Sequence, residues 1–319
     1  MKGVKSYLVG QALLSVCILT LSANAQKYEW FKISEHAQFS PRDSSPNACV
    51  IFNEKYWVLG GWRFGGKEWK SYADVWESKD GIKWDSVNAL PPYSHYSSFI
   101  VFRDRIWAFS ERTYYSDNGK DWIEVKISHP MEVHNRVTLF RKRLWYQKNT
   151  LIMSSSDGTN WKVETTHAPW GEREEVRMIA FKNKLYLSGG SINYNTGSDF
   201  YYNDVWVSSD GRNWKEIIKN AEWPGRYWFS LEAFDNKLWL FGGWDYHQQN
   251  NGEFGNFNDI WISSDKGKSW ENVKFDLIWQ NRHAMFTWVD KNGLWMSSGY
   301  GQGGPTRLYN DVWLLKKVK

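Results

Sequence analysis

The chain has 319 residues, a formal net charge of +5 and an aromatic content of 18%, with 23 Trp, 17 Tyr and 17 Phe. The positive charge is modest and contains no basic block, which argues against a nucleic-acid partner. Aromatic residues at this density are typical of stacked β-sheets and of surfaces that bind sugars.

The first 25 residues have the organisation of an export signal. Two lysines precede an apolar stretch over 7–21, and Ala-Asn-Ala at 23–25 supplies a cleavage site. This stretch is shorter than the roughly 20 apolar residues of a membrane helix, so we expect no membrane span. We therefore expect residues 1–25 to be removed and the protein to be secreted or periplasmic. Cys49 is then the only cysteine, which leaves no intrachain disulfide and no cysteine metal cluster.

A two-part sequence pattern recurs along residues 26–319, and this repetition predicts a repeat architecture. The first part is a pair of apolar segments around a tight turn, and the clearest copies, which end in Gly-Gly, span 48–61, 178–190 and 229–243. Weaker copies span 98–110, 136–147 and 285–299. The second part is a hairpin pattern at 74–84, 203–214 and 258–270. Glycine supplies the positive φ that such turns require, so both parts predict β-hairpins.

One tryptophan after each hairpin turn counts the repeats. These residues are Trp84, Trp122, Trp161, Trp214 and Trp270, and Trp30 lies in a similar segment near the start. The last unit ends after Trp313 without a fourth strand, so we predict that the segment around Trp30 supplies it. The result is an all-β, six-bladed β-propeller over residues 26–319, in which few sheet edges stay exposed.

The segments YWVLGG at 56–61 and LWLFGG at 238–243 resemble the double-glycine motif of kelch repeats, which the central domain of galactose oxidase shares. The resemblance extends over 26–319 and implies a kelch-like propeller. It implies no single function, since kelch propellers include oxidases, a sialic acid mutarotase, lyase-like proteins and binding scaffolds. SSDKGKSW at 263–270 also resembles the Asp-box of sialidase propellers, which we interpret as a turn-stabilising device.

Copper radical chemistry of the galactose oxidase kind would need a cysteine linked to a tyrosine. Cys49 lies inside an apolar strand, which favours a buried and inert thiol. No HExxH or CxxC spacing indicates another metal. We predict neither a metal nor a cofactor.

Loop lengths predict which face carries the function. The connections between second and third strands are long at 62–73, 191–203, 244–258 and 299–309, and short in the second and third units. Long loops on a rigid scaffold commonly carry binding sites. We expect these four loops to form a wall, open on one side, around a cleft.

Residues at the start of each innermost strand should converge on the same cleft near the axis. The candidate ligand-binding residues at these starts are Arg136, Arg177, Arg226, Arg282 and His283, and two further candidates in the long loops, directly after Gly-Gly pairs, are Trp62 and Trp244. A guanidinium binds a carboxylate or sulfate with two hydrogen bonds, and tryptophan rings stack on sugar CH groups. The alternatives are hydrogen bonding within the scaffold for the arginines and loop packing for the tryptophans.

The predicted function is binding of a carbohydrate by a monomeric exported propeller, with an acidic sugar as the preferred ligand. If the protein is an enzyme, the candidate acid and base residues are His134, Glu175 and Tyr227. Two alternatives stay open. The protein could be a carbohydrate-active enzyme, either a uronate lyase or a sialic acid mutarotase- or epimerase-like enzyme, or it could be a protein-interaction scaffold.

Overall fold

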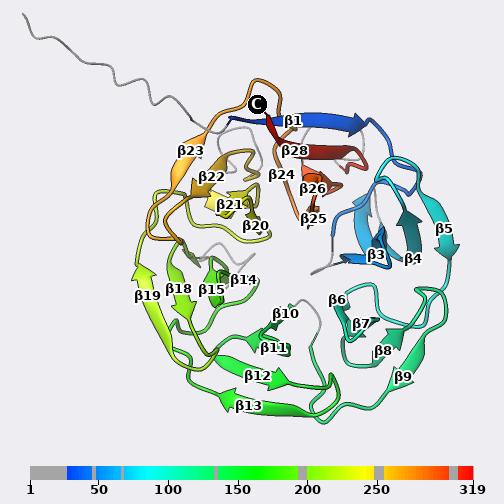
Figure 1. Cartoon of the computed structure of the whole chain (residues 1–319), viewed down its shortest axis with the longest axis horizontal. Helices are drawn as coiled ribbons and strands as arrows, with labels where there is room; N and C mark the ends of the chain where they lie inside the picture. The colour runs from blue at the N-terminus through cyan, green and yellow to red at the C-terminus, as the bar shows by residue number, and fades with distance from the viewer. Residues whose placement is uncertain are drawn as a thin grey trace, which may run out of the picture.

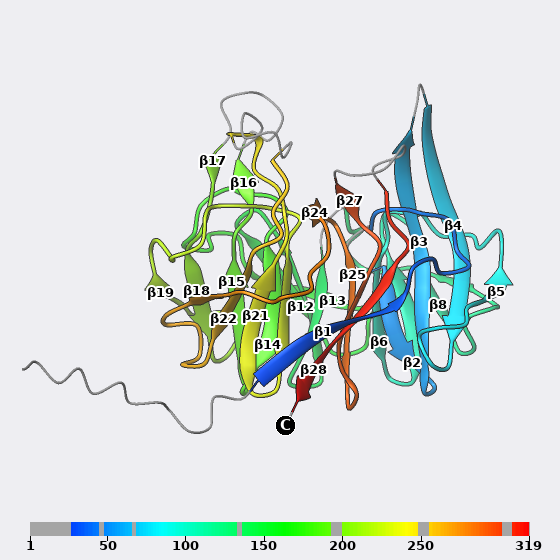
Figure 2. The same ribbon diagram turned by 90° about the horizontal axis from the view of Figure 1, so that it is seen from above.

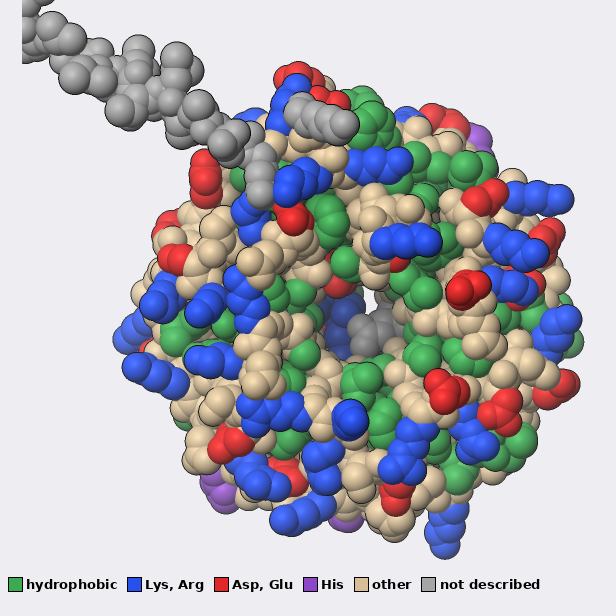
Figure 3. Space-filling view, viewed as in Figure 1, with side chains coloured by type: hydrophobic (Ala, Val, Ile, Leu, Met, Phe, Trp, Pro, Cys, Tyr) green, Lys and Arg blue, Asp and Glu red, His purple; other side chains and the backbone are tan. Residues whose placement is uncertain are grey.

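The computed structural model describes residues 27–44, 48–65, 68–132, 136–192, 200–247, 255–301 and 308–318. Six four-stranded antiparallel sheets surround a central channel, which confirms the predicted six-bladed, all-β propeller (Figure 1; Figure 3). Within these ranges, no helix has the length and hydropathy needed to cross a bilayer. The predicted signal at 1–25 lies outside the described residues.

Each blade runs from an innermost strand at the channel to an outermost strand at the rim. Blade 1 contains β2 (Cys49–Phe52), β3 (Lys55–Gly65), β4 (Glu68–Ser78) and β5 (Asp85–Asn88). Blade 2 contains β6 (Ser98–Phe102), β7 (Arg105–Phe109), β8 (Thr113–Ser116) and β9 (Ile123–Val125). Blade 3 contains β10 (Val137–Phe140), β11 (Arg143–Lys148), β12 (Leu151–Ser155) and β13 (Trp161–Thr165).

Blades 4 and 6 each add a short ribbon to this plan. Blade 4 contains β14 (Arg177–Phe181), β15 (Lys184–Ser188), β18 (Val205–Ser208) and β19 (Trp214–Ile218), with a ribbon of β16 (Ser191–Ile192) and β17 (Phe200–Tyr201). Blade 5 contains β20 (Ser230–Phe234), β21 (Lys237–Phe241), β22 (Ile260–Ser263) and β23 (Glu271–Val273). Blade 6 contains β25 (Phe286–Asp290), β26 (Gly293–Ser297), β28 (Val312–Val318) and β1 (Lys27–Ser34), with a ribbon of β24 (Arg282–His283) and β27 (Tyr300–Gly301).

The ring is closed by β1, which pairs antiparallel with β28 as the outermost strand of blade 6. Trp30 faces Leu315 in this register and is 3% exposed. Its ring packs edge-on against Trp279 at 4.4 Å between centroids. The prediction that the segment around Trp30 completes the last blade is therefore confirmed.

The hairpins between third and fourth strands share one turn geometry. In blade 4, Ser208 Oγ accepts a hydrogen bond from the Gly211 amide at 2.8 Å, and Asp210 Oδ1 accepts from the amides of Arg212 and Asn213. Blade 5 has the same arrangement around Asp265, in the segment that resembles an Asp-box. These contacts within the turn agree with its interpretation as a turn-stabilising device.

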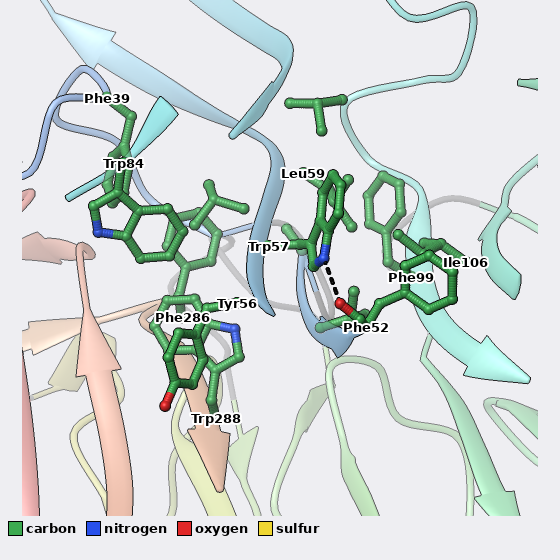
Figure 4. Packing of buried hydrophobic residues seen from close by; sticks show 14 of the residues in the cluster. Phe39, Phe52, Tyr56, Trp57, Leu59, Trp84, Phe99, Ile106, Phe286 and Trp288 are labelled. Atoms are coloured by element: carbon green, nitrogen blue, oxygen red, sulfur yellow. Dashed lines mark hydrogen bonds between the residues drawn. The ribbon is translucent and has the colours of Figure 1, made fainter. Parts of the chain in front are cut away.

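The glycine of each of these hairpins lies against an aromatic ring of the preceding blade. The pairs are Gly81 with Trp295, Gly119 with Trp57, Gly158 with Trp107, Gly211 with Trp145 and Gly267 with Tyr186. Blade 6 has no such hairpin, and Tyr28 of β1 packs on Trp239 of blade 5 at 4.9 Å instead. Figure 4 shows the packing around Trp57, whose Nε1 donates to the Phe52 carbonyl at 2.9 Å. Aromatic packing between neighbours therefore joins the blades.

The long connections rise on one face, which we call the long-loop face. In blade 1 the connection extends the blade, because β3 and β4 each run for 11 residues and pair as far as Gly65 and Glu68. Figure 2 shows the β3–β4 hairpin projecting on the same side as β16 and β17 of blade 4. The segments 193–199, 248–254 and 302–307 of the other long loops lie outside the described residues.

Candidate functional site

Four arginines that precede innermost strands make equivalent contacts inside their blades. Each guanidinium forms two hydrogen bonds to an aspartate at the start of, or within, the third strand of the same blade. The pairs are Arg42–Asp74, Arg173–Asp204, Arg226–Asp259 and Arg282–Asp311. Each arginine therefore ties the start of its blade to the third strand.

Arg226 and Arg282, two of the predicted ligand-binding residues, belong to this set and are 0% exposed. All five N–H donors of Arg282 are used, by Asp311 and by oxygen atoms of Gln280 and Ser298. These contacts favour the scaffold alternative, in which the charge of each arginine is neutralised inside the blade. Arg177 is also buried, and its Nε donates to the Phe229 carbonyl.

The residues two positions after these arginines are joined around the mouth of the channel. Glu175, Trp228 and Ala284 have φ angles of 56°, 54° and 53°. The amide of Ala284 donates to the Trp228 carbonyl at 2.8 Å, and the amide of Ser44 donates to the Ala284 carbonyl at 2.7 Å. A left-handed backbone is costly for non-glycine residues and tends to occur at binding and active sites. We call Ser44, Glu175, Trp228 and Ala284 the mouth ring.

Trp228 is half-buried and stacks on His283, with ring centroids 4.9 Å apart and planes 24° apart. Burial lowers the pKa of His283 to about 3, so its imidazole is neutral. Nδ1 then donates to Asn256 Oδ1 at 2.6 Å. The predicted ligand residue His283 is thus 5% exposed and supports the Trp228 ring from behind.

Two other candidates, Tyr227 and Trp244, form an aromatic wall beside Trp228. Tyr227 is fully buried and stacks on Tyr201 at 5.5 Å, with its ring perpendicular to that of Trp244. Trp244 is half-buried and reaches the surface of the wall. Trp62 stands apart on blade 1, where it packs against Tyr96 at 6.3 Å. The structure therefore groups the blade 5 candidates and separates them from Trp62.

Three charged side chains interact near the axis. Burial raises the pKa of Glu175 to about 7, and a hydrogen bond from Trp228 and the charge of Arg136 limit this rise. Burial also raises the pKa of Glu232 and lowers that of Arg136 to about 10, while the charges of both acids act to raise the pKa of Arg136. Arg136 therefore interacts with two buried acids, and Glu175 can exchange a proton near neutral pH.

A small cavity of about 40 Å³ lies at this position. It is lined by Ser44, Cys49, Arg136, Glu232, Met285 and Thr287. Burial raises the pKa of the Cys49 thiol to about 12, and its Sγ donates to the Thr287 carbonyl at 3.1 Å. Cys49 is thus a protonated thiol at neutral pH, as expected for an inert cysteine. Across the described residues, no group of three His, Cys, Asp or Glu side chains could hold a metal ion.

Sequence reasoning missed Trp228, Glu232 and Asn256. Trp228 follows Arg226 at the same spacing as Glu175 follows Arg173, so an alignment of these two segments would have identified it. Glu232 is an acid on an innermost strand, whereas no signal identifies Asn256, which comes from a long loop. The candidate His134 lies outside the described residues.

Fold and site together define a six-bladed β-propeller with a polar axial mouth beside an aromatic wall. The sequence pattern of the DUF6242 beta propeller domain matches residues 24–314, and the chain belongs to this family.

The structure is also similar to a solved one titled "Structure of YjhT", with a TM-score of 0.65 and 13% identity. The match covers 88% of this chain and 96% of that chain. In total, 505 solved chains match this structure. A likeness at such low identity shows the fold alone.

Proposed function

We propose that this protein binds an acidic carbohydrate at the mouth ring of its long-loop face. The carrying observation is Trp228, which a left-handed backbone and the stack on His283 hold half-exposed beside Glu175. An aromatic ring held in this way offers a flat face to the CH groups of a sugar. Arg136 is the cation of the same mouth and suits a carboxylate or sulfate.

The surrounding residues support a sugar ligand of mixed polarity. Tyr227 and Trp244 supply apolar area, and the half-buried Trp244 lies 6.4 Å from Trp228 between ring centroids. Ligand sites combine such apolar walls with a few fixed polar groups, here Glu175 and Arg136. Export and a monomeric state are part of the same proposal, and cell fractionation and gel filtration of residues 26–319 test them.

A glycan array followed by calorimetry on residues 26–319 tests this function. Trp228→Ala should weaken binding of an acidic glycan roughly two- to tenfold, the effect of losing one aromatic stack. Phe200→Ala is the matched control, because Phe200 is an aromatic residue of the same face, 58% exposed, outside the mouth ring. Equal binding by both variants would remove Trp228 from the site. Silence on all acidic and neutral glycans would contradict the function and direct the search to protein partners.

A second candidate function is catalysis on the bound sugar, which the proton-exchanging Glu175 favours. A carboxyl group with a pKa of about 7 is matched to acid and base catalysis at neutral pH. The two reactions to test are uronate elimination, followed by ultraviolet absorbance of the unsaturated product, and ring opening of a sialic acid, followed by NMR of its anomers. Glu175→Gln should abolish the catalysed rate while binding persists. A wild-type rate equal to the uncatalysed rate in both assays would show that the protein catalyses neither reaction and only binds the sugar.

A further inference from the structure

We propose that the β3–β4 hairpin holds a second anionic group of the same ligand, so that the protein recognises an extended acidic glycan rather than a monosaccharide. This inference rests on the proposed function of the mouth ring. The observation behind it is a pair of cations, Arg63 and Lys70, that the hairpin places directly opposite each other.

Arg63 and Lys70 are Cα partners in the register of β3 and β4, beyond an irregularity between Leu59 and Gly61. Directly opposed side chains of an antiparallel pair lie on the same face, where like charges destabilise the pairing. Lys70 Nζ lies 5.3 Å from the Tyr72 ring, and neither cation forms an ion pair with any acid whose side chain the structure describes, a set that does not include residues 64–69. A bound anion would relieve this repulsion.

The neighbouring Cα partners, Trp62 and Ser71, show which face of the hairpin the two cations occupy. Trp62 packs against Tyr96, and Ser71 Oγ lies 3.1 Å from His95 Nε2, so this face of the hairpin contacts blade 2. Side chains alternate along a strand. Arg63 and Lys70 therefore lie on the other face, away from blade 2.

Charge near the base of the hairpin is already balanced. Tyr72 packs under the Arg42 guanidinium at 4.2 Å, and Arg42 is paired with Asp74. Asp74 is thus engaged with Arg42. It therefore leaves the charges of Arg63 and Lys70 unneutralised.

The base of the hairpin is joined to the mouth ring through the backbone. The amide of Asp43 donates to the Trp62 carbonyl at 2.9 Å, and the amide of Trp62 donates back at 3.2 Å. Asp43 directly precedes Ser44 of the mouth ring. A sugar chain that leaves the mouth over blade 1 therefore meets the hairpin, where a guanidinium and an ammonium suit the carboxylate or sulfate of a further residue.

Calorimetry with galacturonic acid and tetragalacturonate on residues 26–319 tests the inference. Two linked contacts raise affinity, so the wild type should bind the tetramer more tightly than the monomer. The Arg63→Ala/Lys70→Ala variant should lose about tenfold in tetramer affinity, the effect of one charge-assisted hydrogen bond, and keep its monomer affinity. The matched control is Lys120→Ala/Lys268→Ala, which removes the same charge from exposed hairpin turns on the opposite face and should bind as the wild type does.

The outcomes separate the inference from the function on which it rests. Monomer binding that Trp228→Ala weakens, together with a tetramer affinity that Arg63→Ala/Lys70→Ala leaves unchanged, overturns the hairpin position alone. An equal loss in the control variant overturns it as well, because the effect is then one of net charge. Failure of the wild type to bind either sugar acid contradicts the proposed function for this class of ligand, and the hairpin position with it.

Discussion

At the residue scale, the arginines that precede innermost strands differ in their partners. Arg226 and its equivalents are neutralised by aspartates inside their blades, whereas Arg136 lies near the axis with two buried acids. An arginine whose aspartate partner lies in its own blade is therefore a poor candidate for ligand binding, and this criterion argues against Arg226 and Arg282. The criterion does not exclude Arg136 or Arg177, and Arg136 lines the small cavity together with Ser44 of the mouth ring.

The pH dependence of the free energy of unfolding should reflect the ionisation of Glu175. Burial raises its pKa from 4.5 to about 7, so the unfolded chain releases this proton at a lower pH than the folded protein does. The free energy of unfolding should therefore fall as pH rises from about 4.5 to 7, by up to roughly 3 kcal/mol for a shift of this size.

Glu175→Gln should remove this fall, and urea unfolding at several pH values measures it. Glu216→Gln, a change at an exposed residue of β19, should retain the wild-type dependence. Parallel stability curves for the wild type and Glu175→Gln would show that Glu175 ionises in the folded protein as it does in water.

At the element scale, the hairpin glycines set how closely blades can pack. Gly211 has a φ of +80°, and an added Cβ would lie 2.3 Å from the Trp145 ring of blade 3. Gly171 has a similar φ of +77° with nothing within 4 Å of such a Cβ. The two positions therefore separate backbone strain from contact between blades.

We predict that Gly171→Ala costs about 1–2 kcal/mol of unfolding free energy, which is the left-handed strain alone. Gly211→Ala should cost about 1–3 kcal/mol more, because Trp145 must move out of a packed contact. Urea unfolding of both variants measures the difference. Equal losses would mean that the contact between blades 3 and 4 adapts without cost.

At the scale of the whole molecule, stability depends on the closure by β1. Without residues 27–34, β28 would become an exposed edge strand, and Tyr28 and Trp30 would leave their contacts with blades 5 and 6. Tyr28 also donates to Asp235 Oδ2 at 2.5 Å, which fastens β1 to blade 5. Closure thus combines backbone pairing with contacts between side chains.

A protein that begins at residue 35 should unfold at a lower temperature and self-associate in gel filtration. A synthetic peptide of the sequence KYEWFKIS should restore much of the loss by pairing with β28. A peptide in which Ala replaces Tyr and Trp is the control and should restore less, because it lacks both ring contacts. Unchanged stability of the shortened protein would show that the contacts between the other neighbouring blades are sufficient to hold the ring closed.

The fold was predictable from the sequence because its signals are local. Hairpin turns and the tryptophans that follow them repeat along the chain, and the missing fourth strand identifies the role of Trp30. The site was less predictable because its pairings are long-range. Arg226 and Asp259 are 33 residues apart, and similar separations of 32, 31 and 29 recur in blades 1, 4 and 6. Trp228 was missed because its partly exposed position depends on a left-handed backbone. A tryptophan in the sequence does not indicate that conformation.

The register of the closing pair gives the ring a mechanical asymmetry. Lys27 faces Val318 at one end of the β1–β28 pair, and Ser34 faces Val312 at the other. A force applied between Lys27 and Val318 would pull along the hydrogen bonds, which lie perpendicular to antiparallel strands, and would open them one after another. A propeller that is pulled through only one of these two residues should therefore stay closed under a tension that opens it when it is pulled through both.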